Sequence, residues 1–146
     1  MDVIFDLDGT LADLMHRRHH VENKPKNWKA FFAETHKDAV IEPVAVMARL
    51  CTFGNRVIIC SGRPDHLRTV TEEWLAKMWG CATGHAGLYM RRGGDYRADD
   101  IVKEELLDQI IADGFKPVLA FDDRKRVVDM WRRRGLICAQ VAEGNF

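Results

Sequence analysis

The stretch MDVIFDLDGTL at residues 1–11 decides the fold. It contains a short apolar run from Val3 to Phe5, then Asp6, and then a turn at Gly9. A short apolar run that ends in acidic residues is typical of a buried strand in a parallel sheet, because such strands deliver polar side chains at their carboxyl ends. The stretch therefore predicts the first strand of a parallel sheet, with Asp6 and Asp8 at its carboxyl edge.

Strands and helices alternate along the rest of the chain. The other predicted strands are short apolar runs, at Arg56–Cys60, Ala86–Met90, Pro117–Phe121 and Leu136–Val141. Apolar residues at helical spacing predict helices from Pro43 to Gly54, from Leu67 to Gly80, over Asp99–Ala112 and from Val127 to Gly135. Residues 61–64 (SGRP) are expected to break the second strand. This order predicts an α/β fold, a doubly wound five-stranded parallel sheet of Rossmann type with helices on both faces.

One segment interrupts the alternation, between the first strand and the next core helix. Residues 12–42 are rich in His, Lys and aromatic residues, and Asn27–His36 is predicted to form a helix with Trp28, Phe31 and Phe32 on its apolar side. Because the segment follows the acidic strand end, it is placed to act as a small helical cap; a helix simply packed on the sheet is the alternative. We therefore expect a single domain over residues 1–146 with a cap insertion at residues 12–42.

Composition narrows the function classes. The chain has 146 residues with 22 Lys and Arg against 22 Asp and Glu, so no net charge attracts a polyanion and any nucleic-acid contact must be local.

The apolar runs of the chain fall far short of the roughly 18 residues of a membrane helix. No secretion signal is recognised, so we expect a cytoplasmic protein with no membrane contact. The four cysteines form no CxxC pair, which favours reduced thiols over a zinc site.

Acidic and polar side chains collect at the carboxyl ends of the predicted strands. Asp6 and Asp8 follow the first strand, Ser61 the second, and Asp122 with Asp123 the fourth. Ligands of open parallel sheets bind at this edge, where the strand order reverses. Converging carboxylates repel one another unless a divalent cation neutralises them, and ligands that are all oxygen favour Mg²⁺ over zinc. Since Mg²⁺ commonly binds through carboxylates together with substrate phosphate, a phosphate ester is the expected substrate.

The same residues suit phosphoryl transfer through a covalent intermediate. Asp6 is placed to attack phosphorus, with Lys103 as the cation that screens the incoming charge. Asp8 is placed to protonate the leaving oxygen and later to deprotonate water. Ser61 and the backbone N–H groups after it are expected to hold phosphate oxygens. Each group alone has a plainer interpretation, such as an ion pair of Lys103 with Asp99. Their occurrence together, in this order and each at a predicted strand end or helix start, favours a catalytic site.

These motifs resemble those of a known superfamily. Residues 6–11 (DLDGTL) resemble the first motif of the haloacid dehalogenase superfamily of aspartyl-phosphate phosphatases, and Ser61, Lys103 and Asp122 with Asp123 resemble its second, third and fourth motifs. A closer similarity is to the 3′-phosphatase domain of phage polynucleotide kinase-phosphatase. It is carried by residues 97–105 (RADDIVKEE), 121–124 (FDDR), 130–133 (MWRR) and 140–142 (QVA).

The resemblance implies a role for each matching residue. It makes Asp6 the nucleophile and Asp8 the general acid/base. The implied Mg²⁺ ligands are Asp6, the backbone carbonyl of Asp8, Asp122 and Asp123. Lys103, oriented by Asp99, would bind phosphate. The implied substrate-binding arginines are Arg17, Arg63 and Arg91, with Arg92 and Arg97 as competitors for the role of Arg91.

The function implied by the resemblance is a Mg²⁺-dependent polynucleotide 3′-phosphatase in nucleic-acid repair. Its partners would be 3′-phosphorylated DNA or RNA ends in a bacterial or phage-infected cell, beside a separate kinase or ligase, since this chain has no GxxxxGK[ST] loop of its own. A phosphatase of free nucleotides or other small phosphoesters is the alternative. A phospho-acceptor signalling module is disfavoured, because Asp8 is placed to hydrolyse the phosphoaspartate. DNA against RNA, opening of 2′,3′-cyclic phosphates and oligomeric state remain open.

Overall fold

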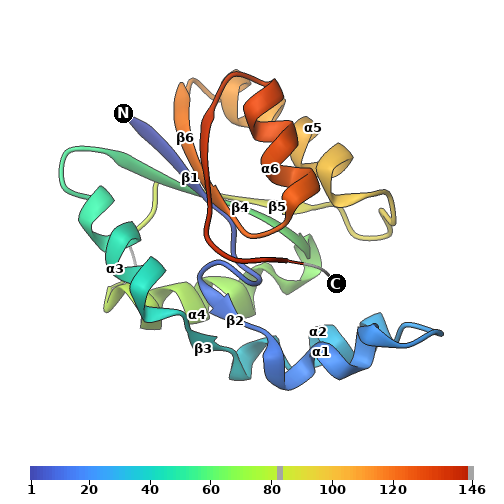
Figure 1. Ribbon diagram of the computed structural model, residues 1–146. Coiled ribbons are helices and arrows are strands. Elements are labelled where there is room, and N and C mark those ends of the chain that lie inside the picture. Colours follow the sequence, from blue (N-terminus) through green and yellow to red (C-terminus); the bar gives the residue numbers. More distant parts are fainter. Residues whose placement is uncertain (82–83, 145–146) are drawn as a thin grey trace.

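A computed structural model describes residues 1–81 and 84–144 (Figure 1). At its centre lies a parallel sheet of five strands in the order β5-β4-β1-β6-β7. The strands are β1 (Asp2–Phe5), β4 (Arg56–Pro64), β5 (Gly87–Arg91), β6 (Pro117–Asp122) and β7 (Ile137–Gln140). The predicted five-stranded doubly wound sheet is confirmed.

The order of the strands reverses at β1. The chain moves from β1 to β4 and β5 on one side, and then returns to β6 and β7 on the other. All four residues of β1 are buried, since it pairs with β4 along one edge and with β6 along the other. The carboxyl ends of β1, β4 and β6 therefore meet at the point where open α/β sheets bind their ligands.

Helices cover both faces of the sheet (Figure 1). On one face, α5 (Asp99–Ala112) and α6 (Lys125–Arg133) pack Leu107 and Trp131 against Ile4 of β1. On the other face, α3 (Glu42–Cys51) and α4 (Arg68–Trp79) pack against the alternate side chains of β1. The predicted helix Asp99–Ala112 matches α5 at both ends, and Gly80 ends α4 with a positive φ of 71°.

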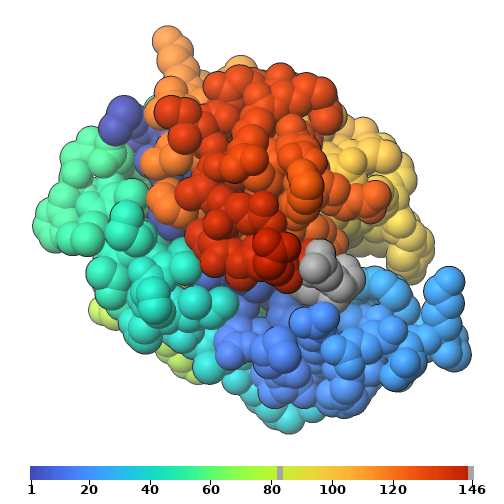
Figure 2. Space-filling model, viewed as in Figure 1, coloured from blue at the N-terminus to red at the C-terminus, as the bar shows by residue number. Residues whose placement is uncertain are grey.

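Residues 12–42, the expected cap and called the cap below, are built differently from the single helix that the sequence predicts. The cap contains α1 (Met15–Glu22), α2 (Trp28–Ala33), a 3₁₀ helix η1 (Thr35–Lys37) and a two-stranded ribbon of β2 (Ala12–Asp13) and β3 (Ala39–Val40). The predicted helix Asn27–His36 is wrong in extent, because α2 ends at Ala33. The sequence also gives little sign of α1, since only Arg17 and Val21 of its eight residues are buried. Figure 2 shows the cap, coloured from blue to cyan, against the core.

The second core strand is longer than predicted. The expected break at residues 61–64 does not occur, and a further 3₁₀ helix, η2 (Asp65–Leu67), follows β4 directly. The register with β5 shifts between Ser61 and Pro64 instead, so the irregularity lies inside the strand. Ser61 and Arg63 are consequently held by the sheet rather than by a loop. None of the described helices is long and apolar enough to cross a bilayer.

We predict that Trp131→Ala destabilises the protein by about 3–5 kcal/mol, because it removes one of the largest fully buried side chains of the core. Urea unfolding should show a lower midpoint with an unchanged slope. As a matched control, Ile137→Ala on the neighbouring strand removes a side chain from a residue that is 74% exposed, and it should stay within about 0.5 kcal/mol of the parent. Equal effects of the two changes would contradict this packing.

Candidate active site

Three aspartates meet at the carboxyl edge of the central strands. Asp6 directly follows β1, Asp122 ends β6, and Asp123 is the next residue. All three are buried, and each offers a carboxylate oxygen that lies within 4.8 Å of the others. Gly9, with a φ of 89°, allows this approach, because a Cβ at that position would collide with the Asp123 carboxylate. The acidic cluster expected from the sequence is thus brought together by the sheet.

Lys103 reaches the cluster from α5 on the covering face. Its side chain is 1% exposed, and its Nζ donates to Asp6 Oδ1 at 2.6 Å and to Asp122 Oδ2 at 2.9 Å. Asp99, expected to orient this lysine, is farther away at 3.7 Å. Burial opposes the charge of Lys103, but the surrounding carboxylates outweigh burial and raise its pKa well above the ordinary value.

One lysine does not balance the three acids of the cluster. Burial raises the pKa of Asp6 well above its ordinary value, and Asp122 and Asp123 raise it further although Lys103 opposes them. Burial and the neighbouring Asp122 likewise raise the pKa of Asp123 to about 6. Asp122 is the most occupied of the three, because its carboxylate also accepts from the Trp131 indole N–H at 3.1 Å and from the Arg124 backbone N–H at 3.1 Å. A divalent cation beside Asp6 and Asp123 would relieve this repulsion.

Asp8 points away from the cluster into a pair of arginines. Its carboxylate accepts from Arg17 Nη2 at 2.7 Å and from Arg63 Nε at 3.0 Å. Burial favours the neutral acid, but Arg63 and Arg17 outweigh it and lower the pKa of Asp8 to about 2. Asp8 is therefore ionised at neutral pH in this arrangement.

Asp38 completes the arginine cluster, and sequence reasoning missed it. It lies between η1 and β3, its side chain is fully buried, and it accepts from Arg17 Nε at 2.7 Å and from Arg63 Nη2 at 2.6 Å. His16 Nε2 lies 2.8 Å from the same carboxylate. No signal in the sequence marks Asp38, because it is an isolated acid in a segment of mixed charge. It ties an arginine of the cap to an arginine of the core sheet.

The end of β4 presents two further groups expected from the sequence. The Ser61 hydroxyl is buried and accepts from the Arg63 backbone N–H at 3.2 Å, which leaves its own proton free to be donated. The Arg63 Nη1 is buried and has no hydrogen-bond partner within residues 1–81 and 84–144. An orphaned guanidinium N–H beside Asp8 is a donor available to an incoming anion.

Arg91 and Asp99 brace the loop between β5 and α5. The Arg91 guanidinium donates to the carbonyls of Gly62, Asp95 and Arg97 and to Asp99 Oδ1 at distances of 2.8–3.1 Å. The predicted substrate contact of Arg91 stays a prediction, since these partners already occupy the side chain. Arg92 and Arg97, the alternatives for this substrate contact, are both exposed, and Arg97 pairs with Asp95 and Glu105.

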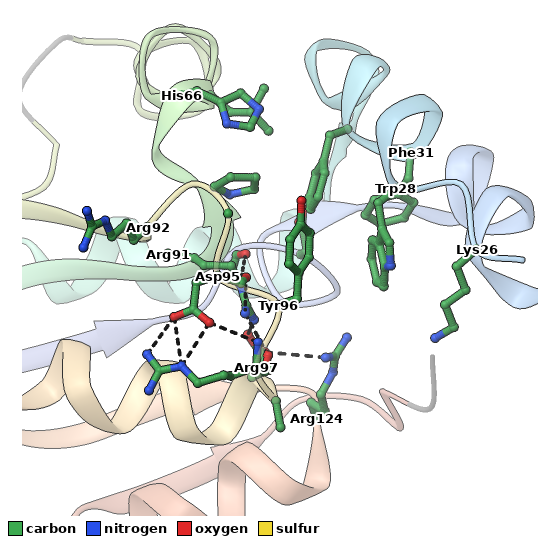
Figure 3. Close-up of a pocket in the computed structure, with 18 of the residues that line it drawn as sticks. Lys26, Trp28, Phe31, His66, Arg91, Arg92, Asp95, Tyr96, Arg97 and Arg124 are labelled. Atoms are coloured by element: carbon green, nitrogen blue, oxygen red, sulfur yellow. Dashed lines mark hydrogen bonds and ion pairs between the residues drawn. The ribbon is translucent and has the colours of Figure 1, made fainter.

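A cavity of about 670 Å³ opens above the acids. Asp6, Asp8 and Asp123 line its floor. Its walls come from the cap, from η2, from the loop before α5 and from the start of α6 (Figure 3). Its volume falls within the 300–1,000 Å³ typical of small-molecule sites. The site can thus accept a phosphate together with the group that carries it.

Comparison with known proteins places the chain in a family. A family model described as the polynucleotide kinase PNKP phosphatase domain matches residues 1–146. The chain belongs to this family, and it is a phosphatase domain of the haloacid dehalogenase type. The resemblance inferred from the sequence is thereby confirmed.

Solved structures agree with this assignment. Chains in a Pnkp1/Rnl/Hen1 complex and in a Pnkp1/Rnl/Hen1 RNA repair complex are each 37% identical, with TM-scores of 0.81, over 99% of this chain. The match covers 46% and 43% of those chains, so this chain spans less than half of their length. The L-2-haloacid dehalogenase of Xanthobacter autotrophicus shares the fold at 14% identity, with a TM-score of 0.61 over 96% of this chain and 76% of that chain.

We predict that Asp38→Ala destabilises the protein by about 3–5 kcal/mol, because two buried arginines would lose a shared carboxylate. Thermal and urea unfolding measure the loss. The matched control is Glu42→Ala, which breaks a pair with Arg49 whose side chains are 64% and 36% exposed and should cost at most about 1 kcal/mol. An Asp38→Ala protein as stable as the control would contradict the arginine cluster.

We predict that, without metal, Asp123→Asn is more stable at pH 7 than the parent. Because the folded state raises the pKa of Asp123 to about 6 from 3.8, ionisation costs stability as pH rises through that window, by an amount of about 1–3 kcal/mol. Urea unfolding at pH 4 and pH 7 in chelator measures this. Added Mg²⁺ should raise the parent's melting temperature more than the variant's. Exposed Asp129→Asn should alter neither result, and identical behaviour of Asp123→Asn and parent would be incompatible with the proposed repulsion.

Proposed function

We propose that this chain is a Mg²⁺-dependent polynucleotide 3′-phosphatase that removes the terminal 3′-phosphate of DNA or RNA. The observation that carries the proposal is the contact of Asp6 with Lys103 at the floor of a cavity in a chain of this family. Asp6 follows the central strand β1, and its side chain lines the cavity. This contact supports Asp6 as the nucleophile and Lys103 as the phosphate-binding cation of the proposed reaction.

The residues present fit a magnesium ion. Asp6, Asp122 and Asp123 offer only oxygen ligands. Burial raises the pKa of Asp6 and of Asp123, and neighbouring carboxylates, whose charge a cation would neutralise, raise both further. When bound, Mg²⁺ would polarise the phosphoryl group and neutralise its charge. Asp122 would be one of the magnesium ligands. Lys103 and Trp131 also donate to its carboxylate, which fixes the direction of that carboxylate.

Asp6 acts as the nucleophile in this proposal. One carboxylate oxygen attacks phosphorus in line, so that an aspartyl-phosphate forms as the bond from phosphorus to the nucleotide O3′ breaks. Lys103 offsets the charge of the approaching phosphate. Water then attacks the phosphorus of the aspartyl-phosphate, which frees inorganic phosphate and restores the Asp6 carboxylate.

Asp8 supplies and removes the protons of the two steps. It gives a proton to the departing O3′ and later takes one from the attacking water. The arrangement without substrate holds Asp8 ionised between Arg17 and Arg63. An incoming phosphate competes for these arginines, and the loss of either contact favours protonation because burial already opposes the charge of Asp8. The arginines thereby serve the phosphate and release Asp8 for proton transfer.

Ser61 and Arg63 hold the oxygens that do not leave. The Ser61 hydroxyl proton and the orphaned Arg63 Nη1 are donors at the carboxyl end of β4. Similar chains in an RNA repair complex support an end-repair role, beside a ligase or a kinase as partner. We place the activity in the cytoplasm of a bacterial or phage-infected cell.

We predict that phosphate release from a 3′-phosphorylated oligonucleotide requires Mg²⁺ and stops in chelator. Asp6→Asn should lower the rate at least a thousandfold in a protein that still folds, since it removes the attacking oxygen but keeps the shape of the side chain. The 5′-phosphorylated twin and the matching 3′-mononucleotide serve as substrate controls.

Either of two results would overturn the proposal. Equal or faster release from mononucleotides would make the chain a phosphatase of small phosphoesters. Unchanged activity of Asp6→Asn would remove Asp6 as the nucleophile. Asp129→Asn, on the exposed side of α6, is the variant control and should match the parent.

A further inference from the structure

Two aromatic side chains stand exposed in the mouth of the catalytic cavity. Trp28 of α2 is 38% exposed and Tyr96, in the loop before α5, is 89% exposed. Both line the cavity that has Asp6 at its floor, and Figure 3 shows Tyr96 reaching up within it on the side where Trp28 and Phe31 lie. Single exposed aromatic rings are common on protein surfaces, but rings gathered in a cavity beside reactive groups are typical of a ligand-binding site.

Trp28 is held in place by the cap beneath it. Its ring packs edge-on against Phe31, with centroids 5.6 Å apart, and is stacked near Phe32 at 5.9 Å. Phe31 is itself buried under the Arg17 guanidinium, 4.1 Å from its ring centroid. The Trp28 ring is therefore a fixed surface rather than a loose side chain.

Tyr96 stands on a loop braced on both sides of it. The carbonyls of Asp95 and Arg97 accept from Arg91 Nη1 at 3.1 and 2.8 Å. The Asp95 carboxylate also binds the guanidinium of Arg97 and its backbone N–H. These contacts fix the backbone while the phenol ring between them stays exposed. The bracing thus presents Tyr96 to the cavity.

The size and charge of the cavity indicate which class of ligand contacts these rings. A phosphate on Asp6 fills only a small part of about 670 Å³, and the rest leads past the two rings. Lys26 lies 5.4 Å from the Trp28 ring, and Lys29 and Arg92 also line the cavity. Apolar ring faces next to cations are the combination that binds bases and backbone phosphates of single-stranded nucleic acids.

We propose that Trp28 and Tyr96 form a binding site for the nucleobase that carries the 3′-phosphate. This inference rests on the proposed function, and it makes the terminal base part of what the enzyme recognises. The base stacks on the rings while its phosphate reaches Asp6, and Lys26 meets the next phosphate of the strand. Stacking tolerates every base, so the site selects nucleotides over smaller phosphate esters without selecting sequence.

The test compares two single-stranded oligonucleotides that end in a 3′-phosphate, one with a normal last nucleotide and one with a stable tetrahydrofuran abasic unit in its place. The parent should show a kcat/KM at least tenfold higher for the strand with the base. Trp28→Ala and Tyr96→Ala should bring that ratio towards one, mainly through a higher KM for the normal strand. Trp28→Phe and Tyr96→Phe should keep most of the ratio because they keep an aromatic face.

The controls separate a lost ring contact from a damaged fold. Phe53→Ala removes an aromatic residue that is 81% exposed and outside the cavity, so it should leave the ratio unchanged. Melting temperatures identify a variant that fails to fold, and the two phenylalanine variants then decide the question. A parent ratio near one, or a ratio that Trp28→Ala and Tyr96→Ala leave unchanged, would overturn the inference. If the parent hydrolyses p-nitrophenyl phosphate but neither oligonucleotide, the proposed function itself fails.

Discussion

The buried ion cluster around Lys103 is the constraint on which the rest of the structure depends. Asp6 and Asp122 end two neighbouring strands, so the parallel pairing of β1 with β6 forces their carboxylates together. Removal of such charges from water is costly unless they are paired, and Lys103 of α5 supplies that pairing. Trp131 of α6 adds its indole N–H to Asp122. Both helices on that face of the sheet are therefore positioned by the chemistry of the site as well as by the apolar core.

A buried cluster of charged side chains joins the cap to the core. Arg17 of α1 and Arg63 of β4 share Asp8 and Asp38, and all four side chains are buried or nearly so. The Trp74 indole N–H of α4 donates to the Asp38 backbone carbonyl at 2.7 Å. This contact fixes Asp38 against the helix layer that contains α4. A phosphate that draws an arginine from Asp8 would act on the same cluster that holds the cap. If the arginines bind phosphate as proposed, substrate binding and cap position would be linked through Asp38.

The elements predicted most accurately are those whose bounds depend on local sequence signals alone. Apolar spacing, an acidic first turn and Gly114 bound α5 at Asp99 and Ala112, and the burial of β1 follows from its apolar run. Prediction fails where tertiary contacts override local signals. The SGRP stretch contains turn residues, but pairing with β5 keeps it in the sheet, and α1 forms with only two buried residues. Asp6 and Asp122 could be placed together because strand ends converge, and Lys103 through its resemblance to a known motif. Asp38 is fixed by partners distant in sequence.

The zero net charge of the chain conceals a strong local separation of charge. Among the described residues, seven Lys and Arg line the cavity against five Asp, and three of those acids lie on its floor. A metal ion held by these acids would neutralise the floor and leave the positive walls to face a substrate. Because the attraction is confined to this cavity, it acts on the phosphates within a Debye length of about 8–10 Å, and a long strand gains little beyond its last nucleotides. In the proposed activity, affinity for the end of a strand would then come from contacts in the cavity, and the exposed rings of Trp28 and Tyr96 would provide such contacts.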